Sequence, residues 1–241
     1  MFKDRVEKKF KEKKYLLVVV ILMIISALGL SISNHIGRRA NVPVDDISLE
    51  TSLSSDSYLL TSIPEIRKGD RIIGSSNADL VVFVYEDYND YFSASLARDI
   101  DRLIRERGKQ IAFVLRPFIG PTNDSVTNSL VLSCIENDSS WQLLRSRLMS
   151  NIYELRAIDL ELIIDDLKLD REELLACAMD KEQNGFVDVI KSDALDYQVY
   201  GSPTLFIEDE LILGARPYED YVDSNGDLVE GLESVIERKL N

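Results

Sequence analysis

Leu80-Val-Val-Phe-Val-Tyr-Glu-Asp-Tyr-Asn-Asp90 is the stretch of sequence that decides the fold. Its first six residues are apolar and mostly β-branched or aromatic, which is typical of a central strand covered on both faces. After an acidic turn, apolar residues recur at helical spacing over 92–104. Asn89 or Asp90 can cap the start of this helix, and Gly108 can end it. The stretch therefore predicts a strand, a tight turn and a helix whose N-terminus lies above the end of the strand.

The sequence beyond this unit predicts an α/β frame with a helical insertion. Residues 111–118 are apolar, and their short separation from the helix implies a parallel βαβ crossover. Strand patterns return at 204–207 and 211–214, and a final helix is predicted at 227–239. Residues 123–200 have helical periodicity and no strand pattern, so they form the insertion. Its predicted helices are 125–135, 139–153, 159–167, 171–179 and 185–199.

The N-terminal part predicts a membrane anchor followed by a linker. Residues 1–14 hold seven Lys/Arg against three Asp/Glu, and residues 15–33 carry no charge over a length that suits a membrane-spanning helix. The basic flank predicts a cytoplasmic N-terminus and an extracytoplasmic C-terminal part. Small residues such as Ser33 also permit a cleaved signal peptide, which leaves the main domain outside the cytoplasm as well. Residues 34–68 are polar and aperiodic, so we predict a flexible linker before a domain at 69–241.

Composition excludes several classes of function. The net charge of −14 argues against nucleic acid and anionic lipid as partners of the folded part. His35 is the only histidine and precedes the predicted domain, which excludes a Ser-His-Asp triad, a Cys-His pair and a His-based zinc site there. Residues 223–230 offer oxygen ligands, but their glycine comes too early for an EF-hand, and Asp227 with Glu230 fits a helix-capping pair better. We therefore predict no metal and no cofactor.

A proline directly before the returning strand is unusual, unless the Ser202–Pro203 bond is cis and forms a tight turn. This motif is one of several that occur in a fixed order. They are residues 78–88, the helix that follows, the Arg-Pro-Phe118 strand end, Cys134, Trp141, Cys177, Gly201-Ser-Pro-Thr204 and Gly214-Ala-Arg-Pro-Tyr218. Together they resemble the DsbA-like branch of the thioredoxin superfamily, in particular its membrane-tethered or secreted thiol-disulfide oxidoreductases. The resemblance covers about 70–241 and implies a thioredoxin-like α/β fold with a helical insertion.

The resemblance also shows where the chain departs from the family. Family members carry Cys-x-x-Cys at the start of the first long helix, and the resemblance puts Asp90 and Ser93 at those two positions. A carboxylate has no sulfur to exchange, and a serine hydroxyl needs a base before it can act as a nucleophile. We therefore predict that the dithiol chemistry is absent and that Asp90 caps the helix, which is worth about 1 kcal/mol.

What remains of the family's site is a predicted peptide-binding groove between the helix start and the Pro203 loop. In the family the residue before this proline, here Ser202, offers main-chain hydrogen bonds to an extended client. Tyr88 and Tyr91 are expected to be exposed beside this groove. We predict a membrane-tethered, redox-inactive module that binds a peptide or protein client in the cell envelope. The client and the oligomeric state are left open.

Cys134 and Cys177 are the only two cysteines and lie in predicted helices. Many relatives also carry a pair in the insertion, and an exported location permits a disulfide, worth about 3–4 kcal/mol by the chain-entropy estimate. One alternative is two buried free thiols. Another is a divergent thiol-disulfide oxidoreductase or isomerase that uses this pair, but neither cysteine has a basic sequence neighbour of the kind that activates a thiol.

Overall fold

The structure is a computed structural model, and it describes residues 62–156 and 159–241. The predicted cytoplasmic segment, the predicted membrane span and most of the predicted linker lie outside the described residues. Among the helices that are described, none is both long and apolar enough to cross a membrane.

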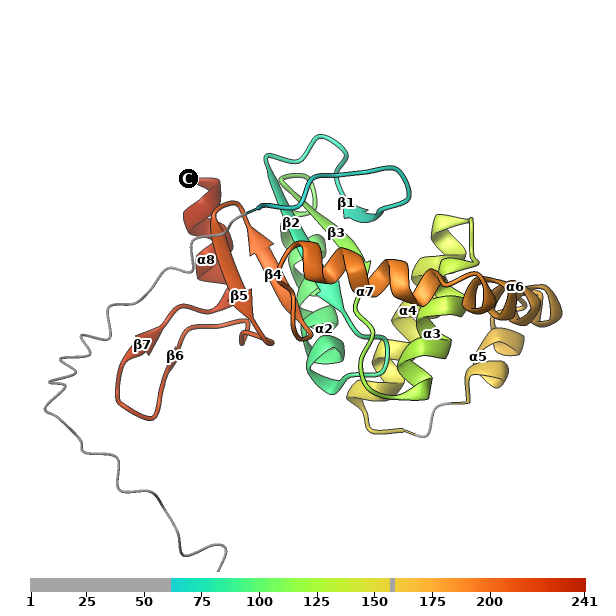
Figure 1. Cartoon of the computed structure of the whole chain (residues 1–241). Coiled ribbons are helices and arrows are strands. Elements are labelled where there is room, and N and C mark those ends of the chain that lie inside the picture. Colours follow the sequence, from blue (N-terminus) through green and yellow to red (C-terminus); the bar gives the residue numbers. More distant parts are fainter. Residues whose placement is uncertain (1–61, 157–158) are drawn as a thin grey trace, which may run out of the picture. The chain divides into compact units, whose positions relative to one another are not determined.

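A five-stranded mixed sheet forms the centre of the domain (Figure 1). The strands are β1 (Arg71–Gly74), β2 (Leu80–Glu86), β3 (Ile111–Pro117), β4 (Thr204–Ile207) and β5 (Glu210–Leu213). Their order across the sheet is β1-β3-β2-β4-β5. β2 and β3 run parallel, which confirms the predicted crossover, and the other neighbours pair antiparallel.

Helices cover both faces of this sheet. Val82 and Val84 of β2 belong to a large apolar cluster that includes residues of α2 (Tyr91–Arg107) and α8 (Leu232–Leu240). Phe83 and Tyr85 belong to a smaller cluster on the opposite face, with Ala194 of α7 (Phe186–Asp196). Because alternate residues of β2 are buried on opposite faces, the apolar pattern of this strand is continuous.

The helical insertion follows β3, as predicted. Its helices are α3 (Asn123–Ser133), α4 (Asp138–Tyr153), α5 (Leu160–Asp166), α6 (Arg171–Gln183) and α7. α3, α4, α5 and α6 each begin after a polar residue whose side chain accepts a hydrogen bond from the third helical N–H. These N-caps are Thr122, Asn137, Asp159 and Asp170.

The last part of the chain differs from the prediction. A helix was expected from Asp227, but β6 (Tyr221–Val222) and β7 (Leu228–Val229) form a short hairpin there, and α8 begins after Gly231. The Asp227 N–H donates to the Asp223 carboxylate at 3.0 Å within the hairpin turn. The predicted Asp227–Glu230 capping pair is therefore wrong, because Asp227 lies in the hairpin turn and the Glu230 carboxylate pairs with Arg238 of α8.

Arg116 binds the segment that precedes β1. It is 2% exposed, and its guanidinium donates two hydrogen bonds of 2.9 Å to the Asp70 carboxylate and one of 2.7 Å to the Glu65 carbonyl. It also donates to the Tyr85 hydroxyl at 3.1 Å, and that hydroxyl lies 3.2 Å from Asp193. This Arg116 cluster fixes the entry of the chain into the domain.

Candidate functional site

The candidate site lies where β2 ends and α2 begins. The Asp90 backbone is extended, and its carboxylate accepts a hydrogen bond from the Ser93 N–H at 2.7 Å. This is the N-cap arrangement that the sequence predicts for Asp90. Since a carboxylate already satisfies one of the free N–H groups of the first turn, the positive end of α2 is partly neutralised by a residue of the chain itself.

Ser93 is buried beneath the first turn of α2. Its side chain is 0% exposed, and its hydroxyl oxygen accepts a hydrogen bond from the Asp87 N–H at 3.2 Å. The hydroxyl therefore stabilises the turn between β2 and α2. Because the Ser93 hydroxyl is buried, it cannot act as a solvent-exposed nucleophile.

Asp87 is a buried carboxylic acid directly below this turn. It is 5% exposed and accepts a hydrogen bond from the Asn89 N–H at 2.9 Å. Burial raises the pKa of Asp87 above its ordinary value, and hydrogen bonds from Ser125, Asn89 and Gly120 oppose that rise. Gly120 approaches so closely that an added Cβ would lie 2.0 Å from an Asp87 oxygen. The sequence-based prediction missed Asp87, although its place between the strand and the cap was a usable signal.

The Pro203 loop is adjacent to the end of β2 in the sheet. The Ser202–Pro203 peptide bond is cis, as predicted, and the register pairs Tyr85 with Thr204. The Pro203 carbonyl accepts a hydrogen bond from the Gly214 N–H at 2.8 Å. Ser202 is half-buried, and its main chain makes no hydrogen bond within residues 62–156 and 159–241.

The prediction that Tyr88 is exposed is wrong. Tyr88 is 2% exposed, and its ring belongs to the apolar cluster that α2, α3 and α4 share. Its carbonyl accepts a hydrogen bond of 2.8 Å from the Asn128 side chain. Burial raises the pKa of the Tyr88 phenol, and the nearby Glu86 charge raises it further. Tyr88 therefore anchors the turn to the insertion and offers no surface for a client.

Tyr91 is exposed, as predicted, and packs with its neighbour Phe92 and with Tyr153, whose part in this aromatic cluster the sequence did not reveal. The Tyr91 ring stacks on Tyr153 of α4, with centroids 5.6 Å apart, and meets Phe92 edge-on at 5.8 Å. The Arg98 guanidinium covers the Tyr153 ring at 4.0 Å. Tyr91 and Phe92 remain 43% and 59% exposed, so the cluster presents aromatic surface at the start of α2.

A buried ion pair joins β2 to the insertion. Arg145 of α4 donates two hydrogen bonds of 2.6 Å to the Glu86 carboxylate, and both side chains are almost fully buried. The two residues are 59 positions apart, so no local sequence pattern pairs them. The pair holds α4 against the end of β2 and thereby positions the turn that carries Asp90.

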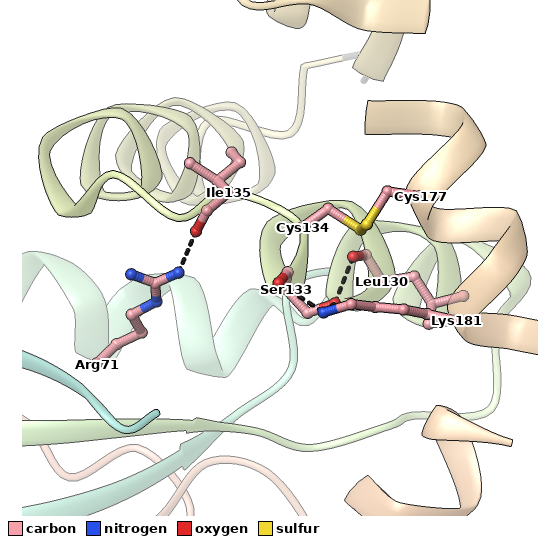
Figure 2. Close-up of a disulfide and its surroundings, with 7 residues drawn as sticks. All are labelled: Arg71, Leu130, Ser133, Cys134, Ile135, Cys177 and Lys181. Atoms are coloured by element: carbon pink, nitrogen blue, oxygen red, sulfur yellow. Dashed lines mark hydrogen bonds between the residues drawn. A yellow bond between two sulfur atoms is a disulfide. The ribbon is translucent and has the colours of Figure 1, made fainter. Parts of the chain in front are cut away.

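Cys134 and Cys177 form a disulfide that joins the end of α3 to α6 (Figure 2). Their Cα atoms are 6.1 Å apart, and both residues are partly exposed. Lys181, one turn beyond Cys177, donates hydrogen bonds to the Ser133 carbonyl at 2.7 Å and its hydroxyl at 3.1 Å. Burial lowers the pKa of Lys181, and the charge of Arg71 lowers it further. In Figure 1 the disulfide-bearing α6 lies well apart from the start of α2.

The described part of the chain has neither a cavity at the predicted groove among its three main cavities nor a cluster of metal ligands. Three cavities on the described surface are lined by other residues than Tyr91, Ser202 and Pro203, so the predicted groove stays a prediction. Among residues 62–156 and 159–241, no group of three or more His, Cys, Asp or Glu side chains is arranged to hold a metal ion. In the 223–230 segment, which offers oxygen ligands, the Asp223 carboxylate accepts hydrogen bonds from the N–H groups of Asn225 and Asp227.

The fold and the site define a class of protein: a DsbA-like thioredoxin fold with a helical insertion. Its first long helix begins with an aspartate and a serine in the first turn. The profile of the family described as thioredoxin matches residues 67–223, and the chain belongs to that family.

Solved structures share this fold at low sequence identity. Oxidised BdbD from Bacillus subtilis is 16% identical with a TM-score of 0.56, and the match covers 72% of this chain and 94% of that one. The thiol-disulfide exchange protein alpha-DsbA2 from Wolbachia pipientis is 17% identical with a TM-score of 0.51, covering 71% and 85%. ScsC from Proteus mirabilis in a transitional conformation is 16% identical with a TM-score of 0.51, covering 96% and 97%. No curated protein matched the sequence.

Proposed function

We propose that this protein is a membrane-tethered, extracytoplasmic thioredoxin-fold module that binds an extended peptide or protein segment and does not exchange disulfides at α2. One observation carries the proposal. The start of α2, where a reactive thiol would stand, holds the Asp90 carboxylate as an N-cap and the buried Ser93 hydroxyl as a turn contact. Both cysteines of the chain are joined to each other elsewhere, in the insertion.

The Pro203 loop and the start of α2 supply the proposed binding surface. Ser202 has main-chain N–H and C=O groups without a partner in the described part of the chain, and such groups can bind an extended segment as an added strand. Exposed aromatic rings are found at the start of α2 and in the sequence just before this loop. Tyr91 and Phe92 begin α2, and Tyr200 precedes Ser202 with 76% of its surface exposed. Large aromatic side chains contribute strongly to binding of apolar or aromatic client residues.

The location of the module rests on the sequence. The uncharged segment 15–33 after a basic flank supports a single membrane-spanning helix with the domain outside the cytoplasm. A tethered domain that keeps a binding loop but lacks exchangeable thiols would capture clients near the membrane without changing their disulfides.

The claim that the protein does not exchange disulfides is tested with the full-length protein in a non-ionic detergent. We expect the wild-type protein to be as inactive as the Cys134→Ser/Cys177→Ser variant in reducing or oxidising a model disulfide. The positive control is Asp90→Cys/Ser93→Cys in the Cys134→Ser/Cys177→Ser background. It should create a dithiol at a helix N-terminus, which favours a thiolate, and should therefore exchange the model disulfide. Exchange by the wild-type protein that the Cys134→Ser/Cys177→Ser variant loses would overturn the redox-inactive proposal and support the alternative, an oxidoreductase that uses this pair.

The binding half is tested with an unfolded, carboxymethylated model protein as the client. Tyr91→Ala should weaken binding at least about five-fold, equivalent to ~1 kcal/mol. Tyr221→Ala is the control, because Tyr221 of the hairpin is similarly exposed, 40% against 43% for Tyr91. Equal loss in both variants, or no binding by the wild-type protein, would contradict the proposed surface.

A further inference from the structure

The largest of the three described cavities lies at the C-terminal end of α2. Its volume is about 820 Å³. Residues 72–74 of β1 line one side, residues 104–110 line the other, and Gln142 of α4 contributes from the insertion. A helix of the length of α2 spans about 25 Å, so the cavity is distant from Asp90 at the other end.

β1 presents a free strand edge at this cavity. It is the outermost strand of the sheet and pairs only with β3 in the part of the chain that the structure describes. An edge strand leaves main-chain N–H and C=O groups that another extended segment can pair with. Ile72 is 46% exposed, whereas Ile73 is 7% exposed, so an added segment would also meet an apolar side chain.

The rim of the cavity is basic although the protein is acidic. Residues 102–109 contain four basic residues and one acidic residue, in a chain of net charge −14. Arg107 already pairs with Glu237 of α8. Arg105 and Lys109 are exposed, line the cavity and have no carboxylate partner within residues 62–156 and 159–241. Because the rest of the protein is acidic and repels anionic segments, an acidic partner should bind preferentially beside these two cations.

We propose that this cavity docks an extended, acidic polypeptide segment, which adds to the free edge of β1 and places carboxylates against Arg105 and Lys109. The four residues of β1 match a partner segment of about 13 Å. Apolar residues that alternate with the carboxylates contact Ile72. The site uses no residue of the Pro203 loop, so it is a second interaction surface. Its test is therefore independent of the test of the proposed function.

The test uses fluorescence anisotropy with the full-length protein in a non-ionic detergent. The probe is a labelled peptide of alternating Glu and Val, compared with Gln-Val and Lys-Val peptides of equal length. We expect the Glu-Val peptide to bind at least ten-fold more tightly than the other two, and to weaken as salt is raised. Arg105→Glu/Lys109→Glu should lose at least ten-fold in affinity. The control Lys168→Glu/Lys191→Glu makes the same change of net charge at two other exposed lysines and should keep its affinity.

Hydrogen exchange tests the strand addition itself. Bound Glu-Val peptide should slow exchange of amides in β1, and the same should hold in the Tyr91→Ala variant. Equal binding by the two double variants, equal binding of the Gln-Val peptide, or unchanged exchange in β1 would each overturn the proposal. So would binding of phosphatidylglycerol vesicles in place of the peptide, or self-association of the protein that Arg105→Glu/Lys109→Glu abolishes.

Discussion

The β2–α2 unit (residues 80–107) and the helical insertion (residues 123–196) are stabilised in different ways. α2 buries six residues, and β2 is buried on both faces. In the insertion, α3 and α4 also bury six residues each, whereas the outer helices α5, α6 and α7 each bury only two. There a disulfide joins α3 to α6, and the Glu86–Arg145 ion pair joins α4 to the sheet.

This difference shows that one domain can combine a region stabilised by many small apolar contacts with a region to which single bonds contribute much of the stability. The β2–α2 unit depends on many apolar contacts, and each contributes a small share of the free energy of unfolding. The insertion adds two specific links to its apolar contacts, the disulfide and the Glu86–Arg145 ion pair, so substitutions at these links should have large effects. The following predictions test this contrast, from the largest expected effect to the smallest.

Arg145→Met should give the largest loss. It leaves the buried Glu86 carboxylate without a counter-charge, which typically costs about 3–5 kcal/mol. The free energy of unfolding is measured by urea titration of Trp141 fluorescence, and Trp141, the only tryptophan, lies in α4 beside Arg145.

Two further variants sharpen this measurement. Glu86→Gln/Arg145→Met removes both charges and should recover much of the loss. Arg171→Met removes an exposed arginine, 46% of whose side chain is accessible, and should cost below about 1 kcal/mol. Similar losses for Arg145→Met and Arg171→Met would show that the buried pair does not hold the insertion to the sheet.

Cys134→Ser/Cys177→Ser should lower the free energy of unfolding by about 2–4 kcal/mol, because the bond closes a long loop in the unfolded chain. Hydrogen exchange should accelerate in α3 and α6 and stay unchanged in α2. The comparison between the regions would fail if α2 exchanged equally faster.

Titration of the same bond in redox buffers separates a structural from a catalytic pair. A structural disulfide should stay oxidised in the native protein until below about −300 mV. Reversible equilibration between about −120 and −230 mV would instead support the alternative, a thiol-disulfide oxidoreductase that uses Cys134 and Cys177.

Asp90→Ala should cost about 1 kcal/mol, because it removes the N-cap of α2. Asp90→Asn keeps an oxygen that accepts the Ser93 N–H and should cost only a few tenths of that amount. Urea denaturation of both variants checks the role of this residue within the β2–α2 unit. Equal losses would mean that the charge of Asp90 matters and its hydrogen bond does not.

The smallest effect concerns Asp87 and pH. Between the ordinary pKa of 3.8 and the raised pKa in the folded state, the folded protein holds a proton that the unfolded chain has lost. The contribution of Asp87 to the free energy of unfolding therefore falls as pH rises through this window. Asp87→Asn should remove that fall, so its stability relative to wild type should increase with pH. Parallel stability curves for the two proteins from pH 3 to 8 would refute this expectation.

The β2–α2 unit could be predicted because its signals are local. The continuous apolar run of the strand, the helical periodicity after it, the Asp90 cap and the Gly108 end all lie within one stretch of sequence. β1 escaped prediction because only Ile73 among its four residues is buried. The two-residue strands β6 and β7 are mostly exposed and too short to show a period.

The candidate site was predictable only in its backbone. Asp90, Ser93 and the Ser202–Pro203 bond lie where the sequence motifs put them. Tyr88 was placed on the surface wrongly, because its burial depends on Asn128 and on the insertion as a whole. Pairs such as Glu86 with Arg145 join residues that are remote in the chain, and only the packed fold brings them together.

The Arg116 cluster has a mechanical consequence. Arg116 belongs to β3, at the centre of the domain. Its guanidinium binds Glu65 and Asp70, which precede β1. A pulling force on the chain before Ser62 therefore loads these hydrogen bonds before the ladder between β1 and β3 carries any tension. The Arg116 cluster therefore protects the pairing of β1 with β3 when the chain that leads into β1 is stretched.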